Sequence, residues 1–175
     1  MNSNIEDELD QEYEQDFIGT PRYSDTIKFI PPVTTGFVIK VYDGDTITIA
    51  SKLPYSQSPL YRFSVRVNGI DCPEMRTSDP NEKECAQLAK EFLHDLLMNK
   101  NVVLKDVDTD KYGRLLADVY IDDKNVSDLM IENRFAVKYD GGTKQVPDNW
   151  MEYHRGCLRK VGQPVVCLRM AVFLW

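Results

Sequence analysis

Short runs rich in β-branched and aromatic residues recur along the middle of the chain, separated by turn residues. They predict five strands, over residues 36–42, 46–50, 61–70, 102–104 and 115–121. Asp43-Gly44 lies between the first two runs and is a strong signal for a β-hairpin. In the third run Arg66 alternates with Val65 and Val67, which places Arg66 on the polar face of its strand.

A longer stretch between the third and fourth strands has helical spacing. Asp79 is a candidate cap, Pro80 suits the first helical position, and Glu82 stands where a capping box needs an acid. The apolar stripe that follows consists of Cys85, Leu88, Ala89, Phe92, Leu93, Leu96 and Leu97. Shorter helices are predicted over residues 126–133 and 149–154, the second capped by Asp148. Five strands with a helix after the third predict a mainly β, α+β fold, a five-stranded OB-fold barrel with two to three helices.

The two ends of the chain differ from this middle part. We divide the 175 residues into an arm (1–33), a domain (34–155) and a tail (156–175). The arm is acidic and contains turn residues, which predicts disorder or loose docking. The tail is apolar; a strand on the barrel, a dimer contact and an exposed end all remain open for it.

The net charge of −7 equals the charge of residues 1–25 within the arm, which contain eight acids and one base. The remainder is neutral, so attraction to phosphate must come from local arginine and lysine side chains and from a bound cation. The chain has only two histidines, and its four cysteines lack the close paired spacing of a zinc site. Both features argue against zinc binding. The sequence contains neither a recognisable signal peptide nor an apolar run long enough for a membrane span. We therefore expect an intracellular monomer; no protein partner can be inferred.

Three short segments carry the candidate chemistry. They are Asp43-Gly44-Asp45-Thr46, the run from Arg66 to Glu74 that contains Asp71-Cys72-Pro73-Glu74, and Asp110-Lys111-Tyr112-Gly113-Arg114. Each alone is most simply a turn. Together they offer the groups that a metal-assisted phosphodiesterase needs.

Asp45 and Asp71 supply the carboxylate oxygens that a hard cation such as calcium prefers. Glu74 is near enough in sequence to orient or deprotonate an attacking water. Arg66 and Arg114 each present a planar guanidinium that matches phosphate oxygens and can stabilise the charge of a pentacoordinate transition state.

These segments, in this order and interleaved with these strands, resemble the staphylococcal nuclease (thermonuclease) family over residues 36–139. The resemblance implies one calcium ion held by Asp45, Asp71 and the backbone carbonyl of Cys72, with Asp43 just outside the ligand set. It implies catalytic roles for Arg66, Glu74 and Arg114 and substrate contacts for Lys111, Tyr112 and Tyr139. The family has threonine where Cys72 stands, and the resemblance ends after Asp148.

The sequence thus predicts a calcium-dependent, thermonuclease-like endonuclease that hydrolyses DNA or RNA, single-stranded included, with low sequence specificity. The alternative is a non-catalytic OB-type module that binds nucleic acid or protein. The presence of all five charged groups, Arg66, Asp45, Asp71, Glu74 and Arg114, favours the enzyme.

Overall fold

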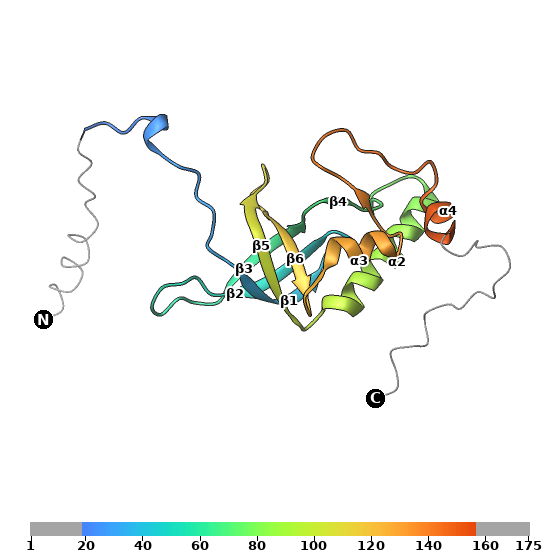
Figure 1. The fold of residues 1–175 in the computed structure, drawn as a ribbon, viewed down its shortest axis with the longest axis horizontal. Helices are drawn as coiled ribbons and strands as arrows, with labels where there is room; N and C mark the ends of the chain where they lie inside the picture. The colour runs from blue at the N-terminus through green and yellow to red at the C-terminus, as the bar shows by residue number, and fades with distance from the viewer. Residues whose placement is uncertain (1–18, 157–175) are drawn as a thin grey trace, which may run out of the picture.

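The computed structural model describes residues 19–156, and its centre is a β-barrel (Figure 1). The barrel strands are β1 (Thr35–Val41), β2 (Thr46–Ser51), β3 (Tyr61–Val67), β5 (Asn101–Thr109) and β6 (Leu115–Ile121). They lie in the order β3-β2-β1-β5-β6, and parallel pairing of β3 with β6 closes the sheet on itself. All the other pairs are antiparallel, so the predicted five-stranded OB-like barrel is confirmed.

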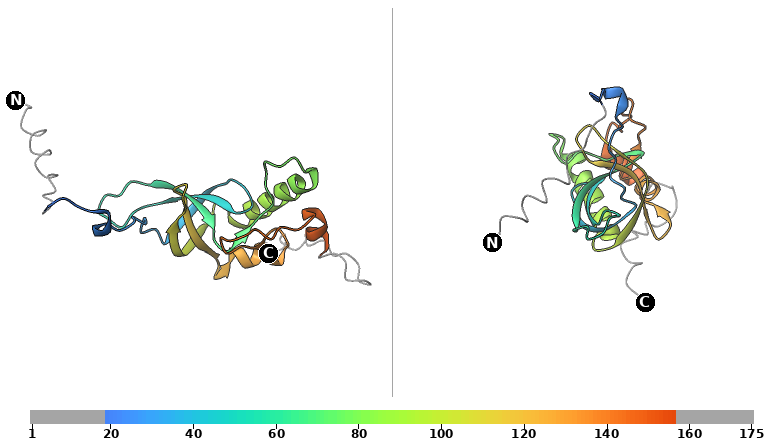
Figure 2. Two further views of the ribbon diagram at one scale, coloured as in Figure 1. Left: turned by 90° about the horizontal axis from the view of Figure 1, so that it is seen from above. Right: turned by 90° about the vertical axis from the view of Figure 1, so that its left-hand side faces the viewer.

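One long helix, α2 (Pro80–Leu97), covers an end of the barrel. Its apolar stripe is buried, with Ala89, Leu93 and Leu97 fully inaccessible to solvent. Figures 1 and 2 show α2 at the end opposite the β2–β3 loop and the N-terminal arm. No helix within residues 19–156 is long and apolar enough to cross a bilayer.

Small elements surround the barrel. The strands β4 (Ile70–Asp71) and β8 (Val137–Lys138) form a separate two-stranded ladder, and β7 (Lys124–Asn125) extends the main sheet beside β6. A 3₁₀ turn, η1 (Tyr23–Asp25), lies in the arm, and the helices α3 (Val126–Glu132) and α4 (Trp150–Arg155) follow β7 and β8. The apolar tail predicted from residue 156 onward lies outside the described residues, except for Gly156.

The third predicted strand is wrong at its end, because it is not continuous to residue 70. It stops at Val67, and Gly69 adopts a left-handed φ of 77° that only glycine reaches without strain. The chain turns there, so Ile70 and Asp71 pair with β8 instead. Arg66 precedes this turn and Asp71 follows it, and both lie at one end of the barrel.

The fourth strand is longer than its apolar core predicts. It continues to Thr109, which pairs with Leu115, after an irregularity between Lys105 and Asp108. In its second half the exposed Asp106 and Asp108 alternate with the half-buried Val107 and Thr109, so this part of the strand has only one apolar residue to reveal it.

Two predicted helix caps need correction. Asp79 does cap α2 by accepting from the Asn81 N–H, but Glu82 accepts from the backbone of Glu74 at 3.0 Å and forms no capping box. Asn149, rather than Asp148, caps α4, because its side chain accepts from the Glu152 N–H.

Candidate active site

The β1–β2 turn places Gly44, between Asp43 and Asp45, against Cys72 and the middle of α2. A Cβ on Gly44 would lie 3.0 Å from Cys72 Cβ and Sγ and 3.1 Å from Ala89 Cβ, so this approach depends on glycine. Asp43 accepts from the Asp45 N–H at 3.2 Å, and the Asp45 carbonyl accepts from the Val67 N–H at 2.8 Å. The turn is therefore fixed to both β3 and the segment that follows β4.

Arg66 joins the two aspartates predicted to hold a cation. Thr46 is its cross-strand partner, which places its side chain next to Asp45. The guanidinium pairs with Asp45, contacts Asp71 Oδ1 at 3.5 Å and donates to the Ile70 carbonyl at 3.1 Å. Asp45 and Asp71 are only 7% and 2% exposed, so their charges need such a partner.

The titration of neighbouring groups reflects this concentration of negative charge. Burial, followed by the charge of Asp45, raises the pKa of Asp43 to about 6. Burial and the charges of Asp45 and Asp43 raise the pKa of the Cys72 thiol well above its usual value, so the thiol stays neutral. Burial alone would lower the pKa of Arg66, but Asp45 outweighs it and the pKa is raised.

Glu74 lies at the rim of this group. Its side chain is 63% exposed, while its backbone N–H is held by Glu82 of α2. The link between Glu74 and Asp71 is Lys144, whose ammonium lies 2.8 Å from Asp71 Oδ1 and 3.2 Å from Glu74 Oε1. Lys144 comes from the loop between β8 and α4.

Arg114 ends the β5–β6 turn on the strand next to Arg66. Because Arg66 pairs with Leu116, Arg114 lies two residues away on the same side of the sheet. Its side chain donates to Asp110 at 2.7 Å, and Asp110 also accepts from the backbone of Tyr112 and Arg114. Burial opposes ionisation of Asp110, but these hydrogen bonds outweigh it and lower its pKa.

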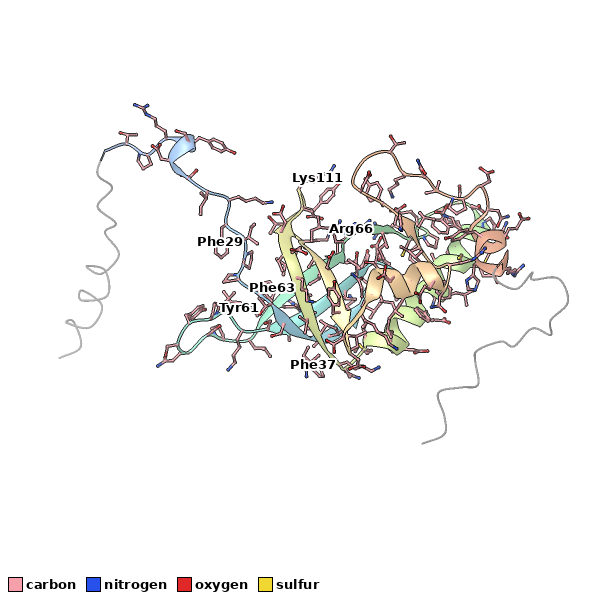
Figure 3. All side chains as sticks on the ribbon, in the orientation of Figure 1. Phe29, Phe37, Tyr61, Phe63, Arg66 and Lys111 are labelled. Carbon is pink, nitrogen blue, oxygen red and sulfur yellow. The ribbon has the colours of Figure 1, made fainter. Side chains whose placement is uncertain are left out.

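The turn residues that precede Arg114 face solvent. Tyr112 is 73% exposed, and the Lys111 ammonium lies 5.1 Å from the centre of its ring. Figure 3 shows Lys111 at the tip of the β5–β6 hairpin and Arg66 nearer the barrel. Within residues 19–156, no hydrogen bond or ion pair connects Arg114 with Asp45 or Asp71.

Tyr139 directly follows β8, whose Val137 pairs with Asp71. Its N–H donates to the Gly69 carbonyl. Its side chain lines a polar cleft of about 840 Å³ together with Asn68, Asp118, Ser127 and Gln145. Of the predicted site residues, the structure thus brings together Asp43, Asp45, Arg66, Asp71, Cys72 and Glu74, and it leaves Lys111, Tyr112, Arg114 and Tyr139 around them.

The family model for "Staphylococcal nuclease homologue" matches residues 64–154, slightly more than half of the chain. The chain belongs to this family. The match includes the Arg66-to-Glu74 segment and Arg114, and β1 and β2 precede it. The family therefore agrees with the barrel and with the resemblance recognised in the three segments.

Individual relatives agree with the family assignment. A probable endonuclease of Schizosaccharomyces pombe is 34% identical over 128 residues, which cover 61% of this chain and 56% of that protein. An uncharacterized endonuclease of Haemophilus influenzae is 34% identical over 102 residues, covering 58% and 51%. A probable staphylococcal-like nuclease of Oryza sativa is 33% identical over 78 residues, covering 45% and 22%. The chain spans about half the length of the first two relatives.

The donor chemistry of the site fits a hard divalent cation. Asp45 and Asp71 offer buried carboxylate oxygens to one guanidinium, and Asp43 adds a third carboxylate, whose pKa burial and then the charge of Asp45 raise. In the part of the chain that the structure describes, no three acidic, histidine or cysteine side chains already surround one point. A cation would therefore have to draw the carboxylates from Arg66 and Lys144.

Three contributors to the site were missed in the sequence. Lys144 lies in a glycine-containing loop with no periodic pattern, and nothing local relates it to Asp71. The position of Glu82 in the first turn of α2 predicted a capping box, and its actual partner, the Glu74 N–H, is eight residues away and has no local signal. Asp110 could have been recognised, since an aspartate at the start of a turn commonly accepts from backbone N–H groups within it.

Proposed function

We propose that this chain is an endonuclease that hydrolyses phosphodiester bonds of DNA or RNA, including single strands, with calcium and with low sequence specificity. The observation that carries the proposal is the convergence of Asp45 and Asp71 on Arg66, in a family whose relatives carry endonuclease names. All the groups concerned address phosphate or water, and phosphate carries no sequence information.

Asp45 and Asp71, with the carbonyl of Cys72, would hold the calcium ion. When bound, the ion would supply positive charge beside the scissile phosphate. Asp43 would remain behind the ligands and contribute negative charge.

Glu74 would accept the proton of the attacking water, because its side chain is the exposed carboxylate of the group. Arg66 would turn one edge of its guanidinium to a phosphate oxygen once a cation takes over the aspartates. Arg114, on the neighbouring strand, would leave Asp110 for a second phosphate oxygen. Lys111, Tyr112 and Tyr139 would contact the flanking parts of the substrate.

The experiment is cleavage of a labelled single-stranded oligonucleotide in millimolar calcium, with and without chelator. Glu74→Gln keeps the size of an exposed side chain, so the fold should survive while the rate falls by about 10²- to 10⁴-fold. Glu132→Gln is the matched control, because Glu132 is an exposed acid at the end of α3.

Cleavage that persists in chelator would refute calcium dependence. Equal rates for Glu74→Gln and the parent would refute the role of Glu74. Binding of the oligonucleotide without any cleavage would instead support the non-catalytic module.

A further inference from the structure

The β8–α4 loop, residues 139–149, reaches the site through one side chain. Lys144 lies about seventy positions from its partners, yet its ammonium contacts both Asp71 Oδ1 (2.8 Å) and Glu74 Oε1 (3.2 Å). In Figure 1 this loop runs past β4 before it reaches α4. Within the described residues, Lys144 provides the only hydrogen bonds and ion pairs between residues 143–148 and the rest of the protein.

The two cationic side chains at the site are held differently. Arg66 is 16% exposed and also donates to the Ile70 carbonyl, so the barrel fixes it. Lys144 is 45% exposed and its ammonium bonds only to the two carboxylates. Burial alone would lower the pKa of Lys144, but Asp71 and Glu74 outweigh it and raise the pKa, so the side chain stays charged at neutral pH.

An ammonium and a divalent cation prefer the same oxygens and repel each other. Asp71 Oδ1 accepts from the Lys144 ammonium at 2.8 Å, so a cation on that atom would have to displace the ammonium or lie beside a like charge. We propose that Lys144 is a built-in competitor of calcium: it holds Asp71 and Glu74 in the metal-free protein and leaves them when calcium binds. This inference rests on the proposed calcium site and deepens it.

Two consequences follow from the competition. Calcium binds less tightly than the carboxylates alone would allow, because it must first displace Lys144. Residues 143–148 also lose their polar attachment when calcium binds, so calcium makes them more accessible. The coupling is reciprocal: calcium binding weakens the attachment of the loop, and attachment of the loop through Lys144 weakens calcium binding.

The first test is calorimetric titration of the full chain with calcium chloride in metal-free buffer. Lys144→Met should bind calcium about tenfold more tightly than the parent. The control Lys100→Met removes the same charge from an exposed lysine at the end of the α2–β5 connection and should leave the affinity within about twofold. Circular dichroism establishes that both variants are folded.

The second test uses the unaltered protein and limited trypsin digestion. Cleavage after Lys144, measured against cleavage after Lys52 in the β2–β3 loop, should become faster when calcium is added. Equal calcium affinities for the parent and Lys144→Met, or slower or unchanged cleavage after Lys144, would overturn the competition and leave the proposed nuclease intact. Absence of calcium binding in every variant would overturn both the competition and the calcium site.

Discussion

Replacing Asp43 by asparagine should stabilise the metal-free protein, and only above acidic pH. Burial and the charge of Asp45 raise the pKa of Asp43 from 3.8 to about 6. The folded protein therefore holds this proton more tightly than the unfolded chain does. This contribution is fully present below pH 3.8 and is lost as the pH rises to about 6, so stability falls across that range.

Two pKa units correspond to about 3 kcal/mol. Because Asp43 is partly exposed, solvent screening reduces the expected effect to about 1–2 kcal/mol. Asparagine keeps the oxygen that accepts from the Asp45 N–H, so little else should change. At pH 7 the variant should gain this amount in free energy of unfolding, and at pH 4 almost none.

The assay is urea denaturation in chelator at pH values from 4 to 8, with the exposed Asp123→Asn as control. The difference between Asp43→Asn and the parent should grow between pH 4 and pH 6 and then level off. A difference that is zero at pH 7, or one that does not depend on pH, would show that Asp43 is not under electrostatic stress.

Three further predictions concern packing and chemistry. Gly44→Ala should lower the free energy of unfolding by about 1–3 kcal/mol in urea denaturation. The added Cβ would lie 3.0–3.1 Å from Cys72 and Ala89, two short side chains that cannot swing aside to make room for it. Leu93→Ala should lower the free energy of unfolding by about 2–5 kcal/mol in the same measurement, since Leu93 of α2 is fully buried in the core of the barrel. Arg114→Lys should reduce nuclease turnover by about 100-fold while the melting temperature stays nearly constant; turnover like that of the parent would show that the guanidinium shape is not needed.

The barrel could be predicted because most of its strands have a recognisable local pattern of apolar and polar residues. In β6, every second residue is buried from Leu115 to Ile121, and a period of two is visible in the sequence alone. The extended end of β5 carries a single apolar residue, Val107, and its strand character comes from pairing with β6. The break after Val67 has a local signal, because Asn68-Gly69 is a turn dipeptide, but the pairing of Ile70 and Asp71 with β8, about seventy residues away, has none.

The residues of the candidate site also differ in how far the sequence could reveal them. Pairing of β2 with β3 brings Asp45 to Arg66, and the turn at Gly69 brings Asp71 to the same guanidinium. All three lie in short segments whose residue types and order resemble one family, so the sequence could group them. The contact of Lys144 depends on the path of an irregular loop, which has no periodicity to read. Local sequence thus grouped side chains at the ends of neighbouring strands and gave no signal for Lys144, which an irregular loop brings to them.

The balance of charge within the site explains why a neutral barrel can attract a cation. Asp43, Asp45, Asp71 and Glu74 lie around Arg66 and Lys144, which leaves two negative charges uncompensated when all are ionised. A divalent cation would supply the missing charge. Burial first and the charge of Asp45 second raise the pKa of Asp43 to about 6, so below that pH a proton on Asp43 offsets part of the negative charge instead. Below about pH 6 calcium binding should therefore release this proton, and the calcium affinity should weaken as the pH falls.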